Sequence, residues 1–220
     1  MKKLLVLSFI VSLSFFIGCD KDESDDPNSL GGDVNTEISN VGDEFGLGVM
    51  VGDDYVNLND QIVVKSNNNG LVTLNVKANV SQAPKIKQLL DKIPIDVYDA
   101  NGNIDIDVQF KVTTAGIQDF FNKDNKPHAL VKYDAKVGDQ YKLTKSDGKT
   151  ITRTVTARSD VDDFPYGFWY IKTITLEQDS RIPGVQKFVY RANHKFGIVY
   201  VEIYLEDGSK VSSYVYAPNY

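Results

Sequence analysis

Apolar and polar residues alternate with a period of two over most of this chain, which is the pattern of half-buried β-strands. In residues 71–80 every second side chain is apolar, so one face of this strand is predicted to be buried and the other wet. Asn-Gly at 69–70 and Asp-Gly at 147–148 and 207–208 favour tight hairpin turns. No crossover helix separates the strands after residue 141. The pattern therefore predicts an antiparallel meander.

Two stretches have helical spacing instead. In residues 84–93, Pro84 suits a first turn, and Ile86, Leu89, Leu90 and Ile93 recur at i, i+3, i+4 and i+7. We predict a helix here that lies across the sheet or closes an open end of it. A second, shorter helix is predicted over residues 115–122, with Ile117, Phe120 and Phe121 facing inward.

Residues 164–176 hold the only Trp, Trp169, and a run of large apolar or aromatic side chains from Phe168 to Ile171. A strand that is apolar at every position needs cover on both faces. We therefore predict a central strand here, with the Trp169 ring in the core.

The resulting fold class is mainly β: an antiparallel β-sandwich or a strongly curled meander sheet of roughly eight to twelve strands, with two short helices. No long linker interrupts residues 41–220. We therefore expect a single mainly-β domain there, with two lobes that meet near Tyr133, in preference to two independent domains.

The composition fits a soluble globular body: 220 residues, 42% hydrophobic, with a formal net charge of -6. Nucleic acid is excluded as a partner, because phosphate binding needs a concentrated Lys/Arg surface, and the only basic run is at Lys2 and Lys3.

The amino terminus predicts export. Lys2 and Lys3 precede an apolar run over residues 4–17, which ends at Gly18 before Cys19. This is the organisation of a secretory signal peptide, residues 1–18, and the run is shorter than the ~20 residues of a membrane span. Cys19 is the only cysteine, so it has no partner within the chain and calls for another explanation.

The segment Phe16-Ile17-Gly18-Cys19 resembles the lipobox of bacterial lipoproteins, with Phe16 where that pattern usually has Leu. The resemblance implies cleavage before Cys19 and acylation of its thiol, with palmitate as one such chain, so the membrane would be a partner through lipidated Cys19. Two or more acyl chains anchor a protein stably. The alternative is a secreted protein with an incidental cysteine.

An acidic, Ser/Gly-rich stretch follows Cys19, and we expect residues 19–40 to be a flexible tether. Its acidic start resembles the surface-export signal of Bacteroidota lipoproteins, which implies a surface-exposed outer-membrane protein of the cell envelope. Asp20 beside the cysteine also resembles the inner-membrane retention signal of other Gram-negative bacteria, and a plain spacer is a third reading. Three motifs within residues 132–211 are similar to those of uncharacterised Bacteroidota lipoproteins, which implies no activity; they lie at residues 137–141, 162–168 and 192–197.

One loop carries the elements of a ligand site. Asp160, Asp162 and Asp163 precede Tyr166 and Trp169. Carboxylates beside aromatic rings can bind sugars, because the rings stack on apolar sugar faces and the acids accept hydroxyl hydrogens. The alternative is a hairpin loop over a packed aromatic base.

No catalytic, metal or cofactor site is predicted. An alternating set of oxygen-bearing residues has the spacing of calcium ligands in an EF-type loop: Asp99, Asn101, Asn103, Asp105 and Asp107. Ile104 and Phe110 stand where such a loop needs Gly and Glu, so we favour an Asn-Gly turn. His128 and His194 lack partners at metal-ligand spacing, and we interpret both as surface residues.

Three functions remain. The first is a membrane-anchored, non-enzymatic binding or structural module that contacts a glycan, a lipid or an envelope protein. The alternative is a carrier of apolar ligands inside a curled sheet. A glycoside hydrolase is the least supported, since no motif selects its pair of carboxylates. The concave face distinguishes them: filled by side chains in a module, apolar and hollow in a carrier, or lined by facing carboxylates in an enzyme.

Overall fold

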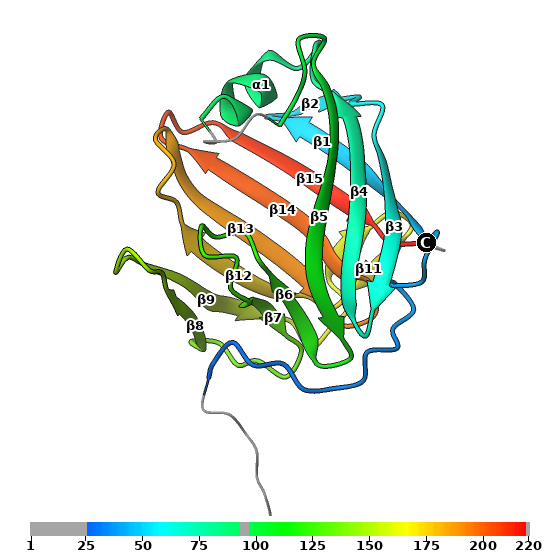
Figure 1. The fold of residues 1–220 in the computed structure, drawn as a ribbon, viewed down its shortest axis with the longest axis vertical. Coiled ribbons are helices and arrows are strands. Elements are labelled where there is room, and N and C mark those ends of the chain that lie inside the picture. Colours follow the sequence, from blue (N-terminus) through cyan, green and yellow to red (C-terminus); the bar gives the residue numbers. More distant parts are fainter. Residues whose placement is uncertain (1–25, 93–96, 219–220) are drawn as a thin grey trace, which may run out of the picture.

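The computed structural model describes residues 26–92 and 97–218. The predicted signal peptide, Cys19 and the first acidic residues lie outside these ranges. Within the described residues, thirteen strands form one antiparallel sheet that curls until it nearly closes into a barrel (Figure 1), and two further strands form a separate hairpin. The prediction of a mainly β, strongly curled antiparallel sheet is confirmed.

The first half of the chain supplies seven strands and the helix. They are β1 (Glu44–Val51), β2 (Asp54–Val56), β3 (Gln61–Asn68), β4 (Leu71–Asn79), α1 (Pro84–Leu90), β5 (Asn103–Thr113), β6 (Gly116–Asp119) and β7 (His128–Lys132). The second half supplies the rest. They are β8 (Gln140–Thr144), β9 (Thr150–Arg158), β10 (Phe164–Tyr166), β11 (Trp169–Ile171), β12 (Ile174–Asp179), β13 (Val185–Asn193), β14 (Gly197–Leu205) and β15 (Lys210–Tyr216).

The first strand of the chain, β1, lies in the middle of the sheet. The strand order of the sheet is β7-β6-β5-β4-β3-β1-β15-β14-β13-β12-β9-β8, with β2 paired to β1. Most neighbours are consecutive in the chain, as a meander requires. There are two exceptions: β1 pairs with β3 on one side and with the last strand, β15, on the other, and β12 pairs with β9 across the intervening β10-β11 hairpin. The two halves of the chain, divided near Tyr133, are thereby parts of one continuous sheet.

The two edges of this sheet, β7 and β8, meet at a seam that side chains bridge. The side-chain amide of Asn28 donates to the Lys142 carbonyl over 2.8 Å and accepts from the Ala129 N–H over 3.1 Å. The Nε2 atom of His128 lies 3.0 Å from the Tyr141 carbonyl oxygen. These bonds satisfy backbone groups at the seam that no strand ladder reaches, and such groups are costly to bury unpaired.

The described part of the predicted tether packs against this body. Asn28, Ile38 and Ser39 are buried, and Ile38 belongs to the main hydrophobic core. The Asn67 side chain also donates to the Ser39 carbonyl over 2.9 Å. Residues 26–40 therefore hold specific contacts, and the folded body begins earlier than the hydrophobic pattern indicated. Besides Ile38, this segment is held by the hydrogen bonds of Asn28 and Ser39, which a hydrophobic pattern does not reveal.

Helix α1 is confirmed over Pro84–Leu90, and residue 93 of the predicted helix lies outside the described ranges. Its side chains Ile86, Leu89 and Leu90 pack against a second hydrophobic cluster that includes Val49 and Val211. The helix thus covers one end of the curled sheet, as predicted (Figure 1). Among the described residues, no helical segment has the length and hydropathy that spanning a membrane requires.

The second predicted helix, residues 115–122, is wrong. This stretch contains strand β6, which pairs with β5 on one side and β7 on the other. A side chain at Gly116 would collide with the Val131 carbonyl oxygen, so only glycine lets β6 approach β7 this closely. The spacing of Ile117, Phe120 and Phe121 imitates a helix turn, but the pairing of the backbone on both sides decides the structure.

The predicted central strand over residues 164–176 is also wrong. It is divided into the β10-β11 hairpin and β12, because Gly167 takes a φ of 57° and begins a two-residue turn. A glycine at this first position is what a type II′ turn requires. Trp169 is 63% exposed and Phe168 is 97% exposed, so neither ring lies in the core. The hairpin instead covers the outer face of the sheet, where Phe164 packs against Tyr200 and Tyr214, and Tyr166 packs against Phe196 and Tyr216.

Candidate functional site

The curled sheet encloses a cavity of about 390 Å³, within the ~300–1,000 Å³ typical of ligand pockets. Alternate side chains of β1, β3, β4, β5, β13, β14 and β15 point into it, since neighbouring residues of a strand face opposite sides. Leu47, Leu74, Phe110, Val201, Ile203 and Val215 are representative of the lining. Among the described lining residues, all but Asp119 and Tyr190 are apolar. The concave face is therefore hollow and apolar.

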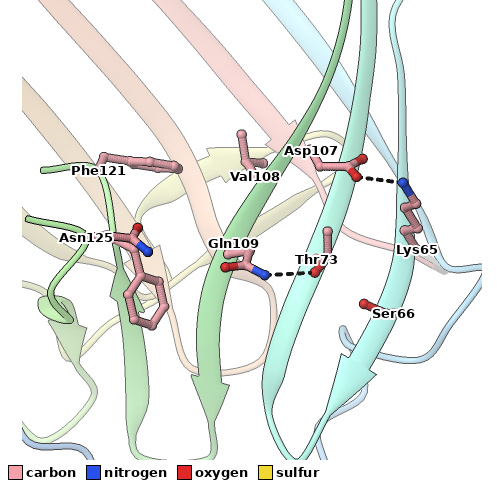
Figure 2. Close-up of a pocket in the computed structure, with 9 residues that line it drawn as sticks. Lys65, Ser66, Thr73, Asp107, Val108, Gln109, Phe121 and Asn125 are labelled. Atoms are coloured by element: carbon pink, nitrogen blue, oxygen red, sulfur yellow. Dashed lines mark hydrogen bonds and ion pairs between the residues drawn. The ribbon is translucent and has the colours of Figure 1, made fainter. Parts of the chain in front are cut away.

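Strand β5 forms the rim of this cavity. Its residues 103–109 pair with β4, whereas β6 pairs only with residues 110–113 on the other side. Beyond β6, the edge of β5 thus has no neighbouring strand in the described sheet. Val108 and Phe121 line both the cavity and an outer pocket of about 600 Å³ (Figure 2). We conclude that the cavity reaches the surface between β5 and the β6-β7 loop.

Phe121 stands at this mouth. It is 56% exposed, and its ring meets the Phe110 ring edge-on, with centroids 5.2 Å apart. On the outer side of β5 the surface is polar: Lys65 and Asp107 form an ion pair of 2.6 Å, and Gln109 donates to Thr73 (Figure 2). The rim therefore separates a polar outer pocket from the apolar interior.

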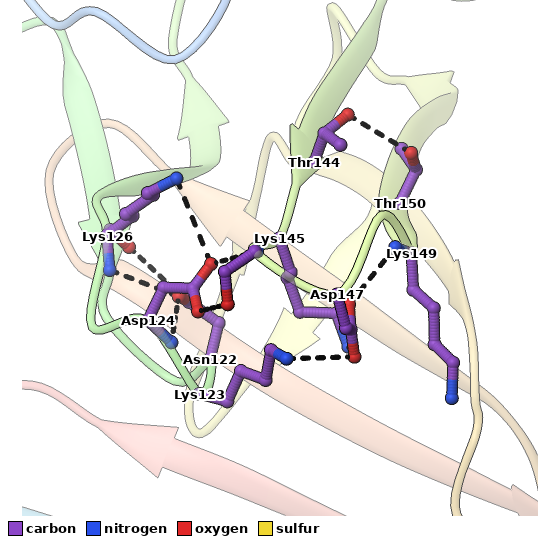
Figure 3. Close-up of polar contacts among 10 residues, drawn as sticks. Asn122, Lys123, Asp124, Lys126, Thr144, Lys145, Asp147, Lys149 and Thr150 are labelled. Atoms are coloured by element: carbon purple, nitrogen blue, oxygen red, sulfur yellow. Dashed lines mark hydrogen bonds and ion pairs between the residues drawn. The ribbon is translucent and has the colours of Figure 1, made fainter.

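The β6-β7 loop that carries Phe121 is tied to the turn between β8 and β9 (Figure 3). Asp124 accepts hydrogen bonds from the Ser146 amide at 2.5 Å and the Ser146 hydroxyl at 2.6 Å. Lys123 also pairs with Asp147 at 3.2 Å. Such exposed pairs contribute little energy singly, but together they place the loop beside the opening.

Asp119, at the end of β6, is the one charged residue among the described lining residues. Its Oδ2 atom accepts from Nη2 of Arg153 over 2.7 Å, and its Oδ1 atom accepts from the Phe121 N–H over 3.1 Å. Both side chains of this ion pair are almost fully buried. Burial raises the pKa of Asp119, although Arg153 acts in the opposite direction.

Arg153 crosses the seam from β9. It donates to Gln178 and to the carbonyls of His128 and Ala129 in addition to Asp119. Its guanidinium also lies 5.8 Å from the centroid of the Tyr190 ring. One buried cation thus joins β6, β7 and β12 and neutralises the acid at the cavity wall.

The interpretation of His128 as a surface residue is wrong. His128 is buried beneath the seam rather than on the surface. Burial lowers the pKa of its ring to about 4, and the nearby positive charge of Arg153 acts in the same direction. A carbonyl can only accept, so the 3.0 Å contact with Tyr141 fits a neutral ring protonated at Nε2. His194 does lie in an exposed turn, between β13 and β14.

The predicted ligand-site residues are only partly brought together. Asp160, Asp162 and Asp163 are exposed in the segment before the hairpin, and Trp169 is exposed within it, beside its turn. Tyr166 is fully buried; its hydroxyl donates to the Val215 carbonyl over 2.9 Å and accepts from the Ala217 N–H over 2.8 Å. Tyr166 is therefore a core residue that fastens the hairpin to β15, and it is removed from the ligand site.

The alternating Asp and Asn residues near residue 100 form a turn, as expected. Asp99 Oδ1 accepts from the backbone N–H groups of Asn101 and Asn103, and Gly102 takes a φ of 81°. Asp107 faces Lys65 on the outer side of β5. Within residues 26–92 and 97–218, no group of three His, Cys, Asp or Glu residues is arranged to hold a metal ion.

Sequence reasoning missed Asp119, Phe121 and Tyr190. The first two lay in the wrongly predicted helix, where Phe121 was expected to face inward. The available signal was a charged residue, Asp119, among residues predicted to face inward. A charged side chain is seldom buried in a core unless a partner neutralises it. That partner, Arg153, lies 34 residues away in the chain and could not be paired with it from the sequence.

No protein-family model and no curated protein matches this chain. Among solved structures, it is similar to a Bacteroides fragilis protein predicted to be exported, whose crystal structure has a YmcC-like fold. The similarity covers 80% of this chain and 95% of that one, at 10% sequence identity and a TM-score of 0.46. At this level of similarity we draw no conclusion about function from it.

Proposed function

We propose that this protein is a membrane-anchored carrier that holds an apolar ligand inside its curled sheet. The observation that supports it is the cavity of about 390 Å³ with an almost wholly apolar lining. A structural module would fill its concave face with side chains, and a glycoside hydrolase would line it with facing carboxylates. The single acid there, Asp119, is already paired with Arg153.

The energetics support the same proposal. Apolar surface that is transferred out of water contributes about 25 cal/mol per Å². A ligand in this cavity would cover side chains of strands on all sides, and the opening beside Phe121 gives it a route to the surface. A protein interior normally packs with few voids larger than a water molecule, so a hollow of this size suits a bound molecule.

A dye-binding experiment tests the proposal. The neutral apolar dye N-phenyl-1-naphthylamine should bind the purified full chain and fluoresce. Leu74→Trp, which places a large ring in the cavity, should weaken dye binding about tenfold or more. Thr73→Trp is the matched control, because Thr73 is the adjacent residue of β4 and faces the outer pocket. Absence of dye binding, or equal loss in both variants while both remain folded, would overturn the carrier proposal.

We further propose that acylated Cys19 anchors the carrier to the outer membrane, facing outward. This rests on the lipobox-like segment and the acidic run behind it. Cys19→Ser should move the protein from the membrane fraction to the soluble fraction, and mass spectrometry of the mature product should find the acyl chains. A Cys19→Ser variant that still sediments with membranes would contradict the anchor. Digestion by protease added to intact cells distinguishes outward from inward orientation.

A second candidate function, glycan binding, is favoured by the β10-β11 hairpin. Trp169 and Tyr170 on β11 are 63% and 65% exposed, and Asp162 and Asp163 are exposed in the segment that leads into β10. Rings of this kind can stack on sugars while the acids accept hydroxyl hydrogens. A glycan array should show binding that Trp169→Ala abolishes and Tyr55→Ala, an exposed ring on β2, preserves. No binding, or equal losses in both variants, would reject this function.

A further inference from the structure

Two polar groups interrupt the apolar wall of the cavity, and both lie near the same cation. Tyr190 projects from β13, stacked on Phe188 with ring centroids 6.4 Å apart. Asp119 projects from the end of β6 and is bound to Arg153, whose guanidinium lies over the Tyr190 ring. One polar spot in an otherwise apolar cavity is the arrangement that orients a ligand with one polar end.

The Tyr190 hydroxyl is available to a ligand. It has no hydrogen-bond partner among the described residues, and Tyr190 lines the cavity. Burial raises the pKa of Tyr190 to about 12, so the hydroxyl keeps its proton near neutral pH. It can therefore donate one hydrogen bond and accept another.

The Asp119 carboxylate can also accept further hydrogen bonds. Each of its oxygens accepts one hydrogen bond within the protein, one from Phe121 and one from Arg153, whereas a carboxylate oxygen has two lone-pair sites. Four of the five N–H donors of Arg153 bond to Asp119, Gln178 and two backbone carbonyls, and Asp119 already balances its charge. An anionic headgroup would consequently meet the acid without gaining a free cation, and like charges at close range in a buried site are costly.

We propose that the ligand of this cavity is a single-chain amphiphile with an uncharged, hydroxyl-type head, which donates to Asp119 and accepts from Tyr190. The inference rests on the carrier function proposed above and adds the ligand class. The hydrocarbon chain would lie against the apolar side chains of β4, β14 and β15. A fatty-acid carboxylate has no O–H group to donate to Asp119. An alkane can neither donate to Asp119 nor accept from Tyr190.

Displacement of N-phenyl-1-naphthylamine from the purified full chain tests the headgroup, with decanol, decanoate and decane as competitors at neutral pH. Decanol should displace the dye at a concentration about tenfold lower than decanoate, as one well-placed hydrogen bond or one like-charge contact is worth roughly that factor. Tyr190→Phe keeps the ring and removes the hydroxyl. It should weaken decanol by about fivefold to tenfold and leave decane unchanged.

Tyr204→Phe is the control, since Tyr204 lies outside the cavity lining and bonds to Glu202. It should leave all three competitors unchanged. If decanoate matches or exceeds decanol, or if Tyr190→Phe and Tyr204→Phe behave alike, the headgroup inference is overturned while the carrier proposal stands. If the dye does not bind the unaltered chain at all, both are overturned.

Discussion

The side chain of Asn28 donates to the carbonyl of Lys142 over 2.8 Å, across 114 residues of chain. The same side chain accepts from the N–H of Ala129. Because Ala129 belongs to β7 and Lys142 to β8, one amide joins the two edges of the sheet. A single side chain of the amino-terminal segment thereby takes the place of a strand at the seam.

We expect Asn28→Ala to destabilise the fold by about 2–4 kcal/mol. The change leaves a buried backbone N–H and a carbonyl without partners, and each unsatisfied buried group costs about 1–3 kcal/mol. Urea unfolding measures the difference. Asn35→Ala is the control, because Asn35 is exposed and bonds through its backbone N–H to Asp33. A loss for Asn28→Ala no larger than that for Asn35→Ala would show that the seam does not depend on this amide.

Removing one partner of the Asp119 and Arg153 ion pair should lower the free energy of unfolding more than replacing both with apolar residues. Arg153→Met alone is expected to destabilise by about 3–5 kcal/mol, because it leaves a buried carboxyl without its cation. The double change Asp119→Leu and Arg153→Met should lose clearly less than the sum of the single changes, since no charge then stays buried. A double-mutant cycle by denaturant unfolding measures the coupling, and additive single effects would refute the prediction.

Protonation of His128 should make the fold acid-sensitive. Burial holds its pKa at about 4, below the ordinary 6.5, so its stability contribution is complete above pH 6.5. As the pH falls from about 6.5 to about 4, the unfolded chain takes up a proton that the folded chain refuses, and the free energy of unfolding decreases. The loss between about pH 7.5 and about pH 4.5 should reach roughly 2–3 kcal/mol.

His128→Gln isolates this effect, because the amide can still donate to the Tyr141 carbonyl but does not titrate. Its free energy of unfolding should vary less over the same range, whereas His194→Gln, at an exposed turn, should behave as the unaltered chain. The raised pKa of Asp119 acts oppositely, favouring the fold at lower pH, and is common to all three proteins. Identical pH profiles for His128→Gln and the unaltered chain would refute the assignment.

Substitution of the exposed Trp169 should affect stability less than substitution of the buried Tyr166, although the hydrophobic pattern predicts Trp169 in the core. Trp169→Ala is expected to cost only about 0.5 kcal/mol or less, because its ring is largely exposed. Tyr166→Phe should cost about 1–3 kcal/mol, since it removes the hydroxyl that bonds to Val215 and Ala217. Thermal unfolding of the two variants measures the order, and a larger loss for Trp169→Ala would place the Trp ring back in the core.

Much of the local structure could be predicted because its causes are local. The alternation over residues 71–80 became β4, and the Asn-Gly and Asp-Gly turns lie where hairpins join neighbouring strands. Helix α1 follows from Pro84 and the spacing of Ile86, Leu89 and Leu90. The two failures occurred where short aromatic stretches were interpreted by period alone. Gly167, whose positive φ makes a turn, was the signal that divides the supposed central strand.

The candidate site could not be predicted in the same way. The predicted ligand-site residues Asp160, Asp162 and Asp163 are exposed, and Tyr166 is buried as a structural anchor. The cavity takes its lining from strands of both halves of the chain, from Phe45 to Val215. Whether alternating apolar faces interlock or leave a space depends on how tightly the sheet curls, and no single strand carries that information.

By itself, the sequence determined the antiparallel strands and the capping helix, because periodicity and turn residues act over a few neighbouring positions. Only the tertiary structure decided that β1 joins β15, that Asn28 bridges the seam, and that Arg153 reaches Asp119. Those contacts join residues far apart in the chain, and their energy appears only when the sheet has curled. The cavity, from which the function is proposed, exists only because the sheet is curved.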